Sequence, residues 1–177
     1  VNEALPNGGK VAVLMANMTK DNLLDRKNGF QERMAQYADD VEASKPPKYE
    51  IVGFLVDEGN SEKCAQNIRD ILKQHPDLAC FVGLNSLHGP TLLKVLQEEN
   101  KLGKVQLVTF DVEAETLDGI EAGHIFASIA QDPYNFGFEA VRMLSELCRG
   151  KTVNLPIVGK GSIYLGAEPI RKENLQD

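Results

Sequence analysis

Short apolar runs rich in β-branched residues alternate along this chain with segments of helical periodicity, and this alternation restricts the possible folds most strongly. Apolar runs of this kind are typical of strands buried on both faces, whereas apolar residues spaced three and four positions apart indicate amphipathic helices. Strands are predicted at 11–15, 49–56, 78–82, 105–110 and 125–130, with extended pieces at 155–158 and 162–165. Helices are predicted at 23–37, 61–74, from about 90 to near 103, 114–122 and 133–149.

This order of elements predicts an α/β fold built on a doubly wound parallel sheet. Strand–helix–strand units with right-handed crossovers place consecutive strands parallel and cover both faces of the sheet with helices. The flavodoxin-like strand order 2-1-3-4-5 is therefore expected. Gly103 and Gly150 follow predicted helices, as C′ glycines do. The last helix should turn its apolar stripe inward, and this stripe consists of Phe136, Ala140, Val141, Leu144 and Leu147.

Charge and hydropathy argue against nucleic-acid binding and against a membrane-spanning helix. The net charge of -7 leaves no basic face for phosphate contacts, so we expect no nucleic-acid partner. No apolar run approaches the roughly 20 residues of a membrane-spanning helix, so we expect no such helix in this sequence. The chain shows no signal peptide, and because Val1 is not a natural start we expect further sequence before it.

The three cysteines give no sign of a metal or cofactor site. Cys64, Cys80 and Cys148 are widely spaced, form no CxxC motif and have no neighbouring histidine in the sequence. Cys80 lies in an apolar run and is interpreted as a small buried hydrophobic residue, with the other two on helices. We therefore predict no metal and no cofactor.

Polar residues that follow the predicted strands are the candidates for function. In an open parallel α/β sheet, ligands bind outside the carboxyl ends of the strands. Asn85, Asp111 and Gln131 each follow a strand there, and Arg26 lies one short loop beyond the first strand. A guanidinium, a carboxylate and two amides can together donate to and accept from the vicinal hydroxyls of a polyol. No serine or cysteine nucleophile accompanies a histidine, so a binding module is favoured over an enzyme.

Each candidate also has a structural alternative. Arg26 could be a solvated surface residue, Asn85 could cap the following helix, and Gln131 could cap a helix or fill a loop. Asp111 could be an N-cap, or the nucleophile or phospho-acceptor of an α/β enzyme. A receiver domain, however, needs an acidic pair after its first strand, and the sequence there is Met15-Ala-Asn-Met18.

Four motifs in order carry a family resemblance. They are Arg26-x-x-Gly-Phe30, Phe81-Val-Gly-Leu-Asn85, Val108-Thr-Phe-Asp111 and Ile129-Ala-Gln-Asp-Pro133. With this series, the chain from about Gly9 to Gln176 resembles the type I periplasmic binding proteins of the ribose/galactose kind and the related lactose-repressor effector domains.

The resemblance implies a particular domain layout. Residues 1–131 would form the C-terminal (second) lobe of a two-lobed sugar-binding fold, and 132–158 would be the returning helix and strand of the first lobe. Residues 159–177 would be the final crossing and C-terminal tail. Because the 133–149 stripe needs a covering surface, the 177-residue chain alone is expected to self-associate.

The resemblance also implies a function: binding of a small sugar or polyol in the periplasm, for delivery to the membrane permease of an ABC-type importer. The alternative is an effector- or signal-binding domain of a lactose-repressor-like regulator or of a membrane sensor. By the family pattern, Arg26 donates to sugar hydroxyls, Asn85 binds hydroxyls, Asp111 accepts from two hydroxyls and Gln131 lies before the hinge. Two departures leave the sugar open: Ser86 stands where the family usually has Asp, and 58–60 lack an aromatic residue.

Overall fold

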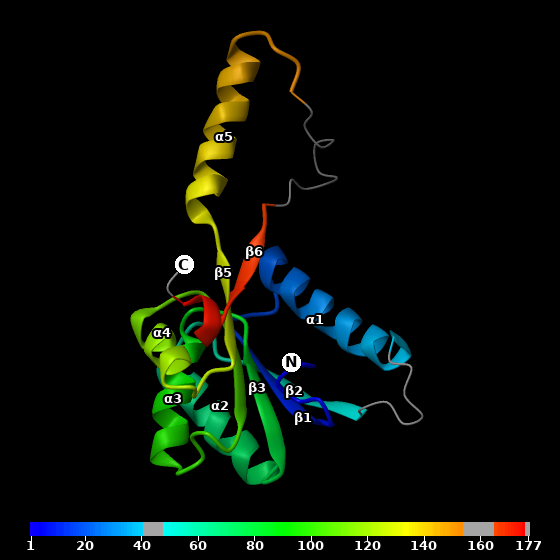
Figure 1. Ribbon diagram of the computed structural model, residues 1–177, viewed down its shortest axis with the longest axis vertical. Coiled ribbons are helices and arrows are strands. Elements are labelled where there is room, and N and C mark those ends of the chain that lie inside the picture. The colour runs from blue at the N-terminus through cyan, green and yellow to red at the C-terminus, as the bar shows by residue number, and fades with distance from the viewer. Residues whose placement is uncertain (41–47, 154–164, 176–177) are drawn as a thin grey trace. The chain divides into compact units, whose positions relative to one another are not determined.

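The computed structural model describes residues 1–40, 48–153 and 165–175, except for the side chains of 37–40. The predicted alternation of strands and helices is confirmed there, and a short strand and a 3-10 helix follow it (Figure 1). The elements are β1 (Gly8–Met15), α1 (Asp21–Asp40), β2 (Lys48–Val56), α2 (Ser61–Gln74), β3 (Leu78–Gly83), α3 (His88–Glu98), β4 (Gln106–Phe110), α4 (Ala114–Glu121), β5 (Ala127–Gln131), α5 (Pro133–Cys148), β6 (Ala167–Ile170) and η1 (Lys172–Asn174).

The sheet has the strand order β2-β1-β3-β4-β5-β6, which confirms the predicted doubly wound arrangement. β1 pairs in parallel with β2 and β3, and the pairs β3–β4 and β4–β5 are also parallel. The edge strand β6 was not predicted, because its four residues include Pro169, which cannot donate a ladder hydrogen bond. Proline is tolerated at the edge of a sheet, and the strand order places β6 there.

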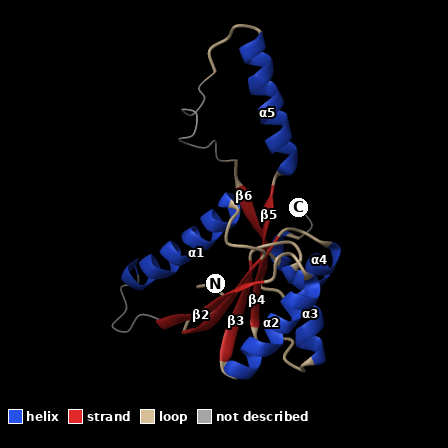
Figure 2. Cartoon of the chain, turned by 180° about the vertical axis from the view of Figure 1, so that it is seen from behind, coloured by secondary structure: helices blue, strands red, loops and turns tan. Residues whose placement is uncertain are grey.

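Successive residues of β1 serve two separate cores. Ala12 and Leu14 pack with residues of α2, α3 and α4 on one face of the sheet. Val11, Val13 and Met15 pack on the opposite face, where α1 contributes Leu23 to the core. Figure 2 shows α1 on one side of the strands and α2 to α4 on the other. A strand buried on both faces needs no polar alternation, which explains the uninterrupted apolar run in the sequence.

The bounds of α2, α4 and α5 lie within one residue of the predictions, whereas α1 is longer at both ends and α3 ends earlier. α2 buries Cys64, Ile68, Ile71 and Leu72, as its periodicity predicted. The prediction that Gly103 is the C′ residue of the next helix is wrong, since α3 ends at Glu98. Asn100 takes the left-handed conformation with φ 53°, and the N–H of Lys101 donates to the carbonyl of Leu96. Asparagine tolerates this conformation better than most residues, so it substitutes for glycine at C′. Gly150 does close α5, with φ 69°.

The chain divides into two compact units. The first comprises Val1–Ile129 with Ile170–Asp177, and the second comprises Ala130–Pro169. In the second unit the prediction that the apolar stripe of α5 faces inward is wrong: no residue of this helix is buried. Val141 and Leu144 are 66% and 61% exposed. Residues 155–158 and 162–164, predicted as extended, lie outside the described residues. Among the described residues, no helix combines the length and apolarity needed to cross a bilayer.

Candidate ligand-binding site

The carboxyl ends of β1, β3 and β4 lie at the same edge of the sheet, because these strands are parallel. Asn85 comes two residues after the end of β3, and Asp111 comes directly after β4. Arg26 lies in α1 and reaches this edge through its long side chain. The first unit therefore brings together three of the four residues that the sequence analysis selected.

Arg26 connects the ends of two strands. Its Nη1 donates to the carbonyl of Leu84 over 2.6 Å, and its guanidinium carbon lies 4.5 Å from the ring centroid of Phe110. Burial lowers the pKa of the guanidinium, and the neighbouring charge of Asp111 opposes that shift. Arginine remains charged at neutral pH regardless of such a shift. The side chain is half-buried and bonded, so the alternative of a solvated surface arginine does not hold.

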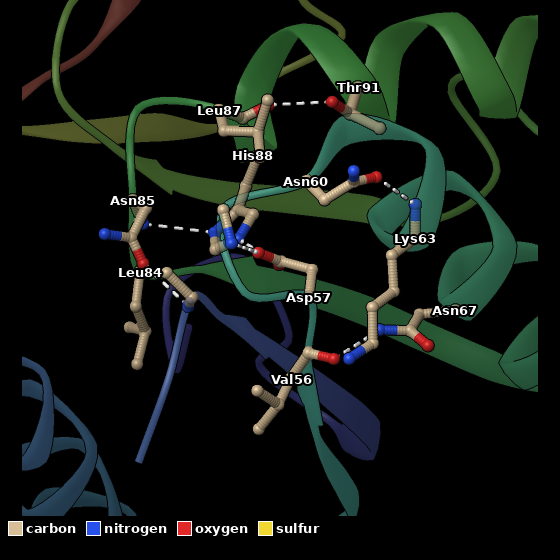
Figure 3. Close-up of polar contacts among 12 residues, drawn as sticks. Val56, Asp57, Asn60, Lys63, Asn67, Leu84, Asn85, Leu87, His88 and Thr91 are labelled. Atoms are coloured by element: carbon tan, nitrogen blue, oxygen red, sulfur yellow. Dashed lines mark hydrogen bonds and ion pairs between the residues drawn. The ribbon is translucent and has the colours of Figure 1, made fainter. Parts of the chain in front are cut away.

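Asn85 is held by both its side chain and its backbone. Its Oδ1 accepts from the backbone N–H of Ala16 over 3.1 Å, and its own N–H donates to Nδ1 of His88 over 3.0 Å. The N-cap residue of α3 is Leu87, so the alternative that Asn85 caps this helix is wrong. In Figure 3 the amide nitrogen of Asn85 points away from His88 and Asp57. Its two N–H groups are thereby directed away from the bonds that anchor the residue.

Asp111 has an unusual backbone conformation, with φ 67°. Aspartate is one of the few residues that visit this left-handed region, at a cost of roughly 1–2 kcal/mol. Two bonds from β5 fix it there: the Asp111 N–H donates to the Ile129 carbonyl over 2.9 Å, and the Ser128 hydroxyl donates to the Asp111 carbonyl over 2.6 Å. The N-cap of α4 is Glu113, so Asp111 does not cap that helix.

Gln131 belongs to the second unit, where it is the exposed last residue of β5 rather than the residue after it. The cap of α5 is Asp132, whose Oδ1 accepts from the N–H of Asn135 over 3.0 Å. Gln131 is thus not a helix cap. The convergence seen for Arg26, Asn85 and Asp111 concerns the first unit alone.

A buried polar cluster that the sequence analysis missed lies behind Asn85. It consists of Asp57, Cys64 and His88, whose potential ligand atoms all lie within 4.8 Å of one another. Nε2 of His88 lies 2.8 Å from Oδ2 of Asp57, and Oδ1 of Asp57 accepts from the N–H of Gly59 over 2.8 Å (Figure 3). All three side chains are fully buried. Asp57 directly follows β2, but nothing local in the sequence links it to a histidine 31 residues away.

Hydrogen bonding favours a proton over a metal in this cluster. Because Nδ1 of His88 accepts from the Asn85 N–H, it carries no hydrogen, and Nε2 must hold the ring proton and donate it to Asp57. A metal at Nε2 would displace that proton and leave an imidazolate. Burial and the charge of Asp57 raise the pKa of the Cys64 thiol to about 12, so it stays protonated. Thiolate is the form that binds metals and attacks substrates, so the arrangement fits neither a metal centre nor a nucleophile.

Comparison with known proteins identifies the family. A family model described as a periplasmic binding protein domain matches residues 1–152. The chain belongs to this family. The resemblance noted in the sequence to periplasmic binding proteins is thereby confirmed, as is the expectation of a binding module rather than an enzyme.

Individual similar proteins show how much of a relative the chain represents. The ribose import binding protein RbsB of Escherichia coli (strain K12) is 26% identical over 147 residues, which are 82% of this chain and 46% of RbsB. The structure of GanP, a glucose-galactose binding protein from Geobacillus stearothermophilus, matches with a TM-score of 0.85 and 26% identity over 99% of this chain and 57% of GanP. AraP, an arabinose binding protein from the same organism, matches with a TM-score of 0.78 and 25% identity over 98% of this chain and 58% of AraP. The chain thus spans about half the length of the relatives that it matches.

Proposed function

We propose that this chain forms the second lobe of a two-lobed solute-binding protein that takes a small sugar or polyol and presents it to an ABC-type importer. The observation that carries the proposal is the placement of Arg26, Asn85 and Asp111 at the carboxyl edge of one parallel sheet. This edge is where open α/β folds bind ligands.

The chemistry of these three groups suits adjacent hydroxyls. Arg26 and the amide nitrogen of Asn85 donate, and the carboxylate of Asp111 accepts. A sugar hydroxyl both donates and accepts, so neighbouring hydroxyls can satisfy groups of both kinds. Charge-assisted hydrogen bonds such as those to Asp111 are the stronger ones, and two hydrogen bonds from β5 fix the left-handed backbone of Asp111. Backbone strain of this kind is concentrated at ligand sites.

The domain layout and the partners belong to the same proposal. Residues 1–131 would make up the second lobe, with Gln131 contributing to the site before the hinge. Residues 132–158 would return to the first lobe, and 159–177 would complete the crossing. RbsB is named for ribose import, and GanP and AraP are named for sugars, which supports importer delivery in the periplasm over a regulator or sensor role. A membrane permease would then be the macromolecular partner.

A binding screen tests the proposal. The full-length protein should be titrated calorimetrically with D-ribose, L-arabinose, D-galactose, D-tagatose and myo-inositol. We expect at least one of these compounds to bind with a Kd of about 10 μM or tighter, equivalent to roughly -7 kcal/mol. A protein that is folded by circular dichroism but binds no member of the panel, nor any further pentose, hexose or inositol, would refute the proposed function.

A further inference from the structure

We infer that His88, oriented by Asp57, is a positioning residue that aims Asn85 into the ligand site. This inference rests on the proposed function for the role of Asn85 toward a sugar, although the geometry of the positioning does not. His88 and Asp57 touch no ligand in this scheme. They act through the backbone of Asn85.

The contacts form a closed series of hydrogen bonds, which we call the polar ring. The Asp57 N–H donates to the Met15 carbonyl over 3.1 Å, and the Asp57 carboxylate accepts from His88 over 2.8 Å. His88 in turn accepts from the Asn85 N–H over 3.0 Å, and Asn85 Oδ1 accepts from the N–H of Ala16 over 3.1 Å. Ala16 follows Met15 in the chain, so the ring is complete. It joins the ends of β1, β2 and β3.

The ring leaves Asn85 with one polar function to offer a ligand. Its N–H, its carbonyl and its Oδ1 are all bonded, the carbonyl to the N–H of His88 over 3.1 Å. The side-chain nitrogen of Asn85, Nδ2, has no hydrogen-bond acceptor among the residues that the structure describes. Asn85 therefore presents two N–H donors in a fixed direction, and the ligand atom opposite must be an acceptor.

Burial makes His88 a rigid support. Both His88 and Asp57 are 0% exposed, so an orphaned bond in the ring could not be replaced by bulk water. His88 also packs directly on β3: a Cβ added to Gly83 would lie 2.4 Å from the Cβ of His88. The imidazole thus has little freedom to move, and its tautomer is set by Asp57 on one side and by Asn85 on the other.

The test compares three variants of the full-length protein. His88→Leu removes the acceptor for the Asn85 N–H, whereas His88→Asn retains one, because the asparagine oxygen takes the place of Nδ1. Cys64→Ala is the matched control: Cys64 is buried in the same cluster and its side chain hydrogen-bonds with Asp57, but it makes no hydrogen bond with Asn85. Two readouts are measured. The first is the Kd for the tightest-binding member of the monosaccharide panel, and the second is the hydrogen-exchange protection of the backbone N–H of Asn85.

We expect His88→Leu to weaken binding by at least about tenfold and to abolish the hydrogen-exchange protection of the backbone N–H of Asn85. His88→Asn should keep the protection and bind within about threefold of the unmodified protein, and Cys64→Ala should do the same. The inference is overturned if His88→Leu retains both affinity and protection, or if Cys64→Ala loses as much as His88→Leu.

A measurement on the unmodified protein covers the case in which His88→Leu does not fold. Nitrogen NMR of the His88 ring should show the proton on Nε2. It should also show a scalar coupling across the hydrogen bond between Nδ1 and the backbone nitrogen of Asn85. A ring protonated on Nδ1 would overturn the inference. If no monosaccharide binds the unmodified protein, the proposed function fails, while the NMR and exchange results still decide whether His88 positions Asn85.

Discussion

Nε2 of His88 lies 2.8 Å from Oδ2 of Asp57, and neither side chain is exposed to solvent. The two residues lie at the start of α3 and just after β2, so the bond fixes a helix against the carboxyl edge of the sheet. A carboxylate in such a place is tolerated only when it is paired, because transferring an unpaired charge from water to the interior is very unfavourable.

Removing one partner of this buried pair should therefore be costly. His88→Leu is expected to lower the free energy of unfolding by at least about 1–3 kcal/mol, because it removes the Nε2–H from which the buried Asp57 carboxylate accepts. Urea denaturation followed by circular dichroism measures the change. The solvent-exposed pair Lys10–Asp77 is the control, and Lys10→Met should leave the midpoint nearly unchanged. Equal losses for the two variants would contradict the assignment of a special role to burial.

Asp111→Asn should reduce sugar affinity without loss of stability. Asparagine tolerates the left-handed backbone at φ 67° and keeps the shape of the side chain, but it carries no charge. A charge-assisted hydrogen bond contributes about 1.5–3 kcal/mol, so calorimetric titration should show a Kd increase of roughly 10- to 150-fold. Glu113→Gln removes the charge of an exposed residue two positions away, and it should leave the Kd unaltered. An unchanged Kd in Asp111→Asn would remove Asp111 from the site.

Gly83→Ala and Gly29→Ala should change stability in opposite directions. A Cβ at Gly83 would lie 2.4 Å from that of His88, and such overpacking typically costs about 1–3 kcal/mol. At Gly29, within α1, a Cβ meets nothing within 4 Å, so alanine should stabilise the helix by about 0.5–1 kcal/mol. Thermal and urea unfolding of both variants check the signs. A stable Gly83→Ala protein would show that His88 can move away from β3.

Stability should fall at alkaline pH because of two buried thiols. Burial, with the charge of Asp57 in the case of Cys64, raises the pKa of Cys64 and of Cys80 from an ordinary 9.0 to about 12. The folded state therefore keeps protons that the unfolded state releases above pH 9. The stabilisation is complete below that pH and is lost as the pH rises toward 12, at about 1.4 kcal/mol per pH unit for each thiol.

Urea denaturation between pH 8 and pH 11 measures this slope. Cys64→Ala should remove about one thiol's share of the slope, whereas Cys148→Ala, at an exposed position, should not alter it. If the free energy of unfolding depends on pH to the same extent in the Cys64→Ala and Cys148→Ala variants, the Cys64 thiol does not lose its proton on unfolding in this pH range.

The exposed face of α5 should make the isolated 177-residue chain self-associate. Tyr134, Val141 and Leu144 are 77%, 66% and 61% exposed, and exposed apolar patches of this kind favour association. Sedimentation velocity should show mass increasing with protein concentration. Changing Val141→Glu together with Leu144→Lys should yield a monomer at the same concentrations. Replacing the exposed Lys73→Glu on α2 should leave the association intact. A chain that stays monomeric at all concentrations would contradict the expectation.

Local patterns accounted for much of the fold. The spacing in α2 predicted both its bounds and its four buried residues, and the apolar run of β1 predicted a strand covered on both faces. The end of α3 was misplaced, because the choice between Asn100 and Gly103 at C′ depends on where the chain must turn toward β4. β6 was missed because a proline argues against a strand until an edge position is available.

By itself, the sequence determined the α/β class and the strand order, and it predicted that Asn85 and Asp111 follow strands, because periodicity and strand ends depend on neighbours close in the chain. Only the tertiary structure decided which hydrogen bonds hold the residues of this edge in place. The Asn85 side chain bonds to Ala16, 69 residues away, and His88 meets Asp57 across 31 residues. Partners so distant in sequence leave no local pattern, since each bond depends on how three parallel strands end side by side.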